Sequence, residues 1–243
     1  MPVEAATTLQ LWEQALPLDD ASRAVLLAAA VAPSVSPDEV MEWPLGRRDA
    51  RLLRLRTALV GRVIDAVTAC PSCGAEVSFD VDAVALERAG EVKEPGLVRV
   101  DGWQVACRPL TTANLVVAAS AEDVTTAEEL LLQAALRSVS PPDDASSEPL
   151  PGSVRRAVVD ALAEADPLAE ILVELVCPGC EVPMTATLDV SAFAWAAVDA
   201  RARLLLRDVD ELARAYGWSE HAVLALSDQR RAAYCAMVGG EGR

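Results

Sequence analysis

The sequence contains a single histidine, His221, and a single lysine, Lys93, among its 243 residues. Catalytic zinc sites keep an open position beside histidine or carboxylate ligands, and general-base catalysis most often uses histidine. The chain also lacks the HExxH and GxSxG patterns and a glycine-rich phosphate loop. We therefore expect His221 to lie on the surface, and the protein to be no enzyme and to have no small-molecule substrate.

Positive charge is scarce as well. Lys and Arg together number 21 against 37 for Asp and Glu, which gives a formal net charge of -16. Because phosphate binding is led by Lys and Arg, this balance argues against a nucleic-acid partner. Almost every basic residue is Arg, so any cationic site would use planar, permanently charged guanidinium groups.

Long apolar runs and targeting segments are also missing. The longest apolar run, residues 24–33, is far shorter than the ~20 residues needed to cross a bilayer. The N-terminal stretch MPVEAATTLQLWEQ has neither the basic region nor the apolar region of a secretory signal. We expect a cytoplasmic protein without a membrane span, in which thiols stay reduced.

Four of the six cysteines form two CPxC motifs that lie far apart in the chain. The pairs are Cys70 with Cys73 and Cys177 with Cys180, and strand-like segments flank each pair. A Cys-x2-Cys turn presents two thiolates from one knuckle, and two knuckles complete a tetrahedral structural site. The sequence therefore predicts one structural Zn²⁺ held by these four thiols, with the residues between the pairs forming a folded insert.

Two alternatives for these cysteines stay open. Iron suits the same four thiolates, and a thioredoxin-type redox pair is a weaker candidate because the residues after Cys73 alternate like a strand. Gly74 after the first pair suits a positive φ, whereas the second pair has Glu181 at that position. Cys107 and Cys235 have no partner at ligand spacing, and we expect them to be small apolar packing residues.

The segments that follow the two pairs look alike. They are FDVDA at residues 79–83 and LDVSA at residues 188–192. We interpret them as equivalent exits from two matching hairpins, offset from each other by two residues.

Periodicity and turn signals predict an α+β fold that is mostly helical, with the zinc ribbon made of two β-hairpins brought together around a helical/β insert. Ser36 to Glu39 and Thr125 to Glu128 read as capping boxes, and Asp101-Gly102 reads as a hairpin turn. The predicted regions are an N-terminal helical region at 1–61, a first hairpin at 62–83, an α/β insert at 84–170 with a mobile loop at 140–152, a second hairpin at 171–190 and C-terminal helices at 191–243.

Two groups of residues are candidates for contacts with a partner protein. One is an arginine stripe at helical spacing, and the other contains residue types that dominate interface hot spots. Ion pairing of the stripe within the chain, and packing of the aromatic residues at a helix corner, are the alternative interpretations. The candidates are Arg47, Arg51 and Arg54 in the stripe, and Tyr216, Trp218, Arg230, Arg231 and Tyr234 near the C-terminus.

Four motifs, taken in order, resemble a known family. They are LGRRDxxLLxLR from residue 45, CPxCG from residue 70, CPxC preceded by ADPxAE from residue 165, and an LAxxYGWSE ending followed by RRxxY. Together they are similar to the zinc-ribbon baseplate proteins of contractile phage tails and related extracellular contractile injection systems, described as T4-family baseplate hub assembly chaperones. The chain departs from that pattern at Ser227, where relatives have a nearby proline, and at Cys235, where they have a leucine.

The resemblance implies a non-enzymatic role in building a baseplate, as a transient chaperone or a minor structural subunit. Its partners would be baseplate or hub proteins. The competing class is a zinc-ribbon adaptor in transcription or on nucleic acid, although acids rather than basic residues surround the knuckles here. A thiol redox protein is the third reading.

Overall fold

Helices account for 56% and strands for 17% of the computed structural model, which confirms an α+β fold that is mostly helical. The structure describes residues 4–32, 34–142 and 149–240. In chain order the elements are α1 (Ala5–Ala15), α2 (Asp20–Ala30), α3 (Pro37–Met41), α4 (Leu45–Val60), β1 (Val63–Ala69), β2 (Glu76–Asp82), α5 (Ala83–Ala89), β3 (Val98–Val100), β4 (Trp103–Cys107), α6 (Thr112–Ala119), α7 (Val124–Ala135), β5 (Leu136–Ser140), α8 (Gly152–Ala165), β6 (Leu172–Val176), β7 (Pro183–Thr187), α9 (Val190–Tyr216), α10 (Glu220–Leu224) and α11 (Asp228–Gly240).

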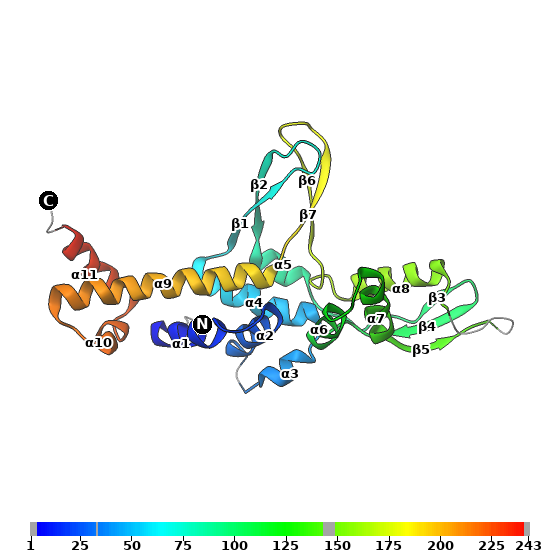
Figure 1. The fold of residues 1–243 in the computed structure, drawn as a ribbon, viewed down its shortest axis with the longest axis horizontal. Helices are drawn as coiled ribbons and strands as arrows, with labels where there is room; N and C mark the ends of the chain where they lie inside the picture. Colours follow the sequence, from blue (N-terminus) through cyan, green and yellow to red (C-terminus); the bar gives the residue numbers. More distant parts are fainter. Residues whose placement is uncertain (1–3, 33, 143–148, 241–243) are drawn as a thin grey trace.

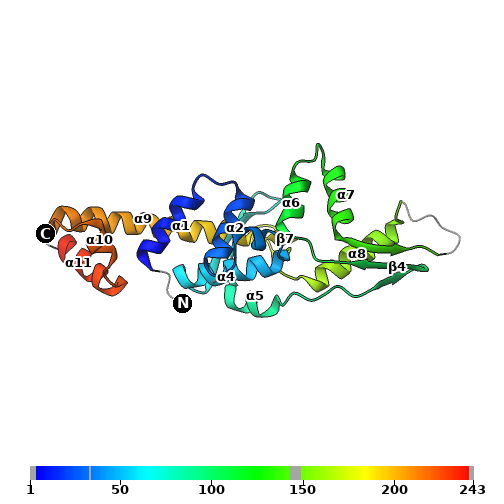
Figure 2. The same cartoon turned by 90° about the horizontal axis from the view of Figure 1, so that it is seen from below.

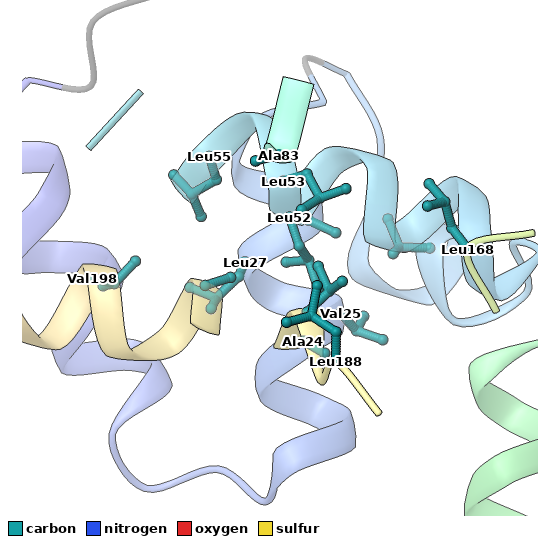
Figure 3. Close-up of a cluster of buried hydrophobic side chains, with 14 of the residues drawn as sticks. Ala24, Val25, Leu27, Leu52, Leu53, Leu55, Ala83, Leu168, Leu188 and Val198 are labelled. Carbon is teal, nitrogen blue, oxygen red and sulfur yellow. The ribbon is translucent and has the colours of Figure 1, made fainter. Parts of the chain in front are cut away.

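The main core lies where α4 crosses α2 and the first half of α9 (Figures 1 and 3). Leu52 and Leu53 of α4 are fully buried there, and Leu27 of α2 and Val198 of α9 pack into the same cluster. Ala24 and Ala28 on α2 are small, so the helix backbones can approach closely. The two hairpins, the insert and the C-terminal helices extend from this helical body (Figure 1).

Helix starts in this body follow local capping chemistry. Ser36 and Glu39 form the predicted capping box of α3, with each side chain bonded to the other's backbone N–H. The box predicted at Thr125 to Glu128 is wrong, because α7 begins at Val124 and the carboxylate of Asp123 accepts from the N–H of Thr126. Aspartate is a stronger N-cap than threonine, so the helix begins after Asp123 and not after Thr125.

Two β-hairpins stand side by side and project from the helical body as an arm (Figure 1). Hairpin 1 is β1 with β2, and hairpin 2 is β6 with β7; both are antiparallel. Alternate residues of β1 and β7 are buried and those of β6 are half-buried, and Ile64 and Ile171 extend this apolar face into the main core at the base. We call the two hairpins together the tower; the cysteine knuckles form its tip.

The two hairpins match residue for residue along their length. Asp82 and Asp189 each follow the second cysteine of their pair at the same interval, and each caps the helix that leaves the tower, α5 or α9. The predicted two-residue offset between the exits is therefore wrong. Asp80, which that alignment equated with Asp189, lies on an exposed face of β2 opposite Asp65 instead.

The insert between the hairpins contains a three-stranded antiparallel sheet with the order β3-β4-β5, against which α8 packs. Its β3–β4 turn is the predicted Asp101-Gly102 turn, and both residues have a positive φ as a type I′ turn requires. Strand β5 was not predicted. The loop expected at 140–152 falls partly on residues 143–148, which lie outside the described residues.

The long helix expected from Ser191 to about Tyr216 is confirmed as α9, and it extends well beyond the body (Figures 1 and 2). Gly217 ends it in the left-handed conformation, which glycine adopts without steric cost. Helices α10 and α11 then fold back along the end of α9. Among the described residues, no helix combines the length and the apolar character that a membrane crossing requires.

Candidate metal centre

The four cysteines of the two CPxC motifs meet at the tip of the tower. Their sulfur atoms all lie within 4.8 Å of one another. The Sγ atoms of Cys70 and Cys180 are 3.7 Å apart, and those of Cys73 and Cys177 are 3.6 Å apart. A tetrahedron of sulfurs around an ion at the Zn–S distance of about 2.3 Å has edges of about 3.8 Å. The predicted ligand set therefore comes together with room for one metal ion.

The same backbone hydrogen bonds shape both knuckles. The N–H of Cys70 donates to the carbonyl of Ala75, and the N–H of Cys177 donates to the carbonyl of Val182. The residue after each pair turns back with a positive φ, 74° at Gly74 and 59° at Glu181. Glu181 thus adopts the conformation that glycine has in the first knuckle, and the difference between the two motifs does not change the fold of the turn.

Hydrogen bonds within the tip shift the pKa values of two of the thiols in opposite directions. Backbone N–H groups of Cys73 and Ser72 lower the pKa of Cys70 to about 6. An N–H group of Ala75 lowers the pKa of Cys73, but the neighbouring thiols outweigh it and raise that pKa to about 12. Four thiols this close cannot all ionise unless a cation balances them. Their spacing and chemistry fit a divalent, thiophilic ion.

The cluster is chemically closed. Cys177 is fully buried and Cys70 nearly so, with Val77 and Met184 packed beneath them. Four protein ligands fill a tetrahedral ion and leave no position for water or substrate. The cysteines are all free thiols, and the knuckles sit between strands rather than at a helix N-terminus. The four thiols therefore match the ligand set of a structural metal site.

The predicted arginine stripe lies along α4 and makes contacts within the chain. Arg54 pairs with Glu87 of α5, and the guanidinium of Arg47 lies 4.0 Å from the ring centre of Trp43. Burial lowers the pKa of Arg51, and the charges of Arg54 and Arg47 add to this effect. Arg47 and Arg54 are nevertheless exposed, so the stripe keeps a positive surface.

The C-terminal candidates separate into two groups. Tyr216 stacks on Trp218 at 4.9 Å, and Tyr234 meets Trp218 edge to face at 4.9 Å. These rings pack the corner of α9 and α11, although Tyr216 stays 40% exposed. Arg230 is exposed.

Arg231 is not available to a partner, contrary to the prediction. Its side chain is only 1% exposed and is paired with Asp208 of α9 and Asp228 of α11. It also donates to the carbonyl of Leu226 at 3.2 Å. The adjacent arginines of the RR motif thus point in different directions, which the sequence alone did not show.

A buried polar cluster near the N-terminus of α4 was missed. Arg48 donates to Asp49 at 2.7 Å and to Thr112 at 3.0 Å. Asp166 accepts from the N–H of Gly46 at 3.0 Å, so it caps α4 from a distant part of the chain. Burial raises the pKa of both Asp49 and Asp166. Only the RRD triplet hinted at this cluster, and Asp166 has no local signal.

The remaining sequence candidates lie away from the tower tip. Cys107 is buried beneath the insert sheet, where burial raises its pKa. Cys235 is partly buried, with its Sγ 3.8 Å from Asp208. His221 is exposed on α10, as expected.

Comparison of the chain with protein-family models, with curated proteins and with solved structures finds no match in any of the three.

Proposed function

We propose that this chain is a non-enzymatic assembly factor or minor component of the baseplate of a contractile, phage-tail-like injection system. In this role it acts as a zinc-stapled scaffold that binds baseplate or hub proteins in the cytoplasm of the producing cell. One structural Zn²⁺, bound by Cys70, Cys73, Cys177 and Cys180, fixes the two hairpins as a zinc ribbon.

The observation that carries the scaffold role is the convergence of four thiols from two distant segments at tetrahedral spacing. A closed four-sulfur site contributes folding energy and has no open position for catalysis. The baseplate assignment is supported by the order of the four family-like motifs along the chain. Two surfaces are candidates for docking: the stripe with Arg47, Arg51 and Arg54, and the corner with Tyr216, Trp218, Arg230 and Tyr234.

The adaptor alternative requires a cationic surface near the knuckles. No Lys or Arg occurs between residues 63 and 87 or between residues 157 and 200, which include both knuckles. Anionic nucleic acid would meet only acids there. Filter binding at low salt separates the two functions, because an adaptor retains nucleic acid in a salt-sensitive manner and the proposed scaffold does not.

The direct test is co-purification with baseplate proteins. The tagged chain is expressed together with the hub, tube and spike proteins of a contractile injection system from the same cell, and we expect it to retain at least one of them. Arg230→Glu should lower that yield, whereas Arg99→Glu, which changes another exposed arginine on β3, should not. Equal retention by wild type and Arg230→Glu would remove the C-terminal corner from the proposal.

Retention of none of these proteins by a zinc-loaded chain would contradict the baseplate role. A reversible two-electron titration of the cysteine pairs in metal-free protein, together with full folding in that state, would support the thiol redox alternative instead.

A further inference from the structure

The outward faces of the tower carry aliphatic residues where a solvated hairpin would carry polar ones. On β1, Val63 is 45% and Val67 is 59% exposed. On β6, Leu172 is 54% and Val176 is 62% exposed. Single exposed aliphatics are ordinary, but each hairpin has two of them four residues apart on its outward face, and this repeat forms a pattern.

An acidic residue lies between the aliphatics of each pair. The exposed stripes read Val63, Asp65, Val67 on hairpin 1 and Leu172, Glu174, Val176 on hairpin 2. Asp65 also lies directly opposite Asp80 of β2 in the strand register. Like charges facing each other across a ladder destabilise it, so this pair favours an oppositely charged neighbour.

These acids have no cation of their own. Asp65, Asp80 and Glu174 form no ion pair within the described part of the chain. The two hairpins contain no Lys or Arg beyond Arg62, which pairs with Asp82 at the base. The stripes of the tower therefore have charge of one sign, and the tower of a second copy, an anionic lipid headgroup or nucleic acid would be repelled.

Hairpin 2 is also hollowed. An open hollow of about 500 Å³ is lined by Glu174, Leu175, Val176, Pro183, Met184 and Thr185. Its wall is polar and apolar in about equal parts and contains a single carboxylate. A basic side chain with an aliphatic neighbour matches this lining, since the charge can pair with Glu174 while the neighbour covers Val176.

We propose that each outward stripe of the tower, residues 63, 65 and 67 on hairpin 1 and residues 172, 174 and 176 on hairpin 2, is a docking surface for an extended partner-protein segment that carries aliphatic, basic and aliphatic side chains at every second position. Alternate residues of an extended segment are spaced like alternate residues of β1 and β6, so its side chains can follow the stripes. This inference rests on the proposed scaffold function and names a second surface, opposite in charge to the arginine stripe of α4.

The test uses the zinc-loaded full chain and three fluorescein-labelled peptides. In the first, valine and arginine alternate at every second position with serine between them, so that both lie on one face of the extended chain. The second has serine in place of the valines, and the third has glutamate in place of the arginines. We expect fluorescence anisotropy to show binding of the first peptide, weaker binding of the second and none of the third. Equal binding of the first two would overturn the proposal, because it would reduce the surface to charge alone. No binding of the first would overturn it as well.

Variants locate the site. Glu174→Gln combined with Val176→Ser should weaken binding of the arginine–valine peptide about tenfold. The matched control combines Glu164→Gln with Val159→Ser on α8, an exposed acid and a 57% exposed valine of the insert. We expect the control to bind like wild type. An equal loss in both variants, or none in the tower variant, would overturn the proposal.

Two further measurements keep the outcome clear. Zinc content and circular dichroism show that each variant is folded, and light scattering shows whether the tower instead mediates self-association, which would overturn the proposed occupant. If the chain retains hub proteins but does not bind the peptide, the docking surface on the tower is refuted and the baseplate function is not. If the chain binds the peptide but retains no hub protein, the baseplate function is refuted and the docking surface is not.

Discussion

Removing one knuckle should cost the protein much of its stability. In Cys177→Ser/Cys180→Ser the ion has only Cys70 and Cys73 left, so the chain between the pairs is no longer pinned at both ends. A covalent link that closes a loop of about 100 residues contributes about 4–5 kcal/mol by loop entropy. We take this as the expected stabilisation by the metal, because the hairpin tips otherwise share only the small cluster around Val77.

Urea unfolding of wild type and variant, each with zinc and with chelator, measures this effect. We expect the variant to lose about 4–5 kcal/mol with zinc, and expect most of that difference to disappear when both proteins are in chelator. Cys235→Ser, which changes a cysteine outside the site, should keep its zinc and nearly all of its stability.

Hydrogen exchange adds a local readout, because the knuckle bonds donated by Cys70 and Glu181 should open first when zinc is removed. If variant and wild type had the same free energy of unfolding in zinc, or differed by the same amount in zinc and in chelator, the metal would not be what stabilises the fold.

Three other predictions concern the buried polar groups. Arg231→Ala should lower the free energy of unfolding by roughly 2–3 kcal/mol in urea titrations, because it removes charged hydrogen bonds of a buried guanidinium; a loss no larger than that of Arg230→Ala would contradict its buried role. Gly46→Ala should destabilise by about 1–3 kcal/mol, since the new Cβ overlaps the Asp166 carboxylate, and Gly239→Ala, with open space around it, is the control. Asp166→Asn should flatten the pH dependence of stability: burial raises the folded pKa of Asp166 above 3.8, so wild type gains stability relative to the variant as pH falls through the folded pKa towards 3.8 and loses it as pH rises. A wild-type-minus-variant difference that stays constant from pH 7 to pH 4 would contradict that shift.

Much of the fold could be predicted because its signals are local. The CPxC knuckles, the alternating strands, the Asp-Gly turn and the Ser36 capping box each depend on a few neighbouring residues. The ligand set was predicted from chemistry, since two Cys-x2-Cys pairs are typical of a structural metal site.

The features that were missed or predicted wrongly depend on contacts between residues far apart in the sequence. Strand β5 depends on pairing with β4, and a short segment such as Leu136–Ser140 carries little periodicity of its own. The burial of Arg231 depends on how α11 folds back against Asp208 of α9. The cap that Asp166 provides to α4 joins residues with no shared sequence pattern. The exits were aligned by resemblance of letters, whereas capping by Asp82 and Asp189 sets their equivalence.

Elemental analysis combined with X-ray absorption on unchelated protein tests the central claim most directly. We expect one zinc ion per chain, surrounded by four sulfur atoms at about 2.3 Å. Protein without a bound transition metal, oxygen or nitrogen in the first coordination sphere, or one ion shared by two chains would contradict it.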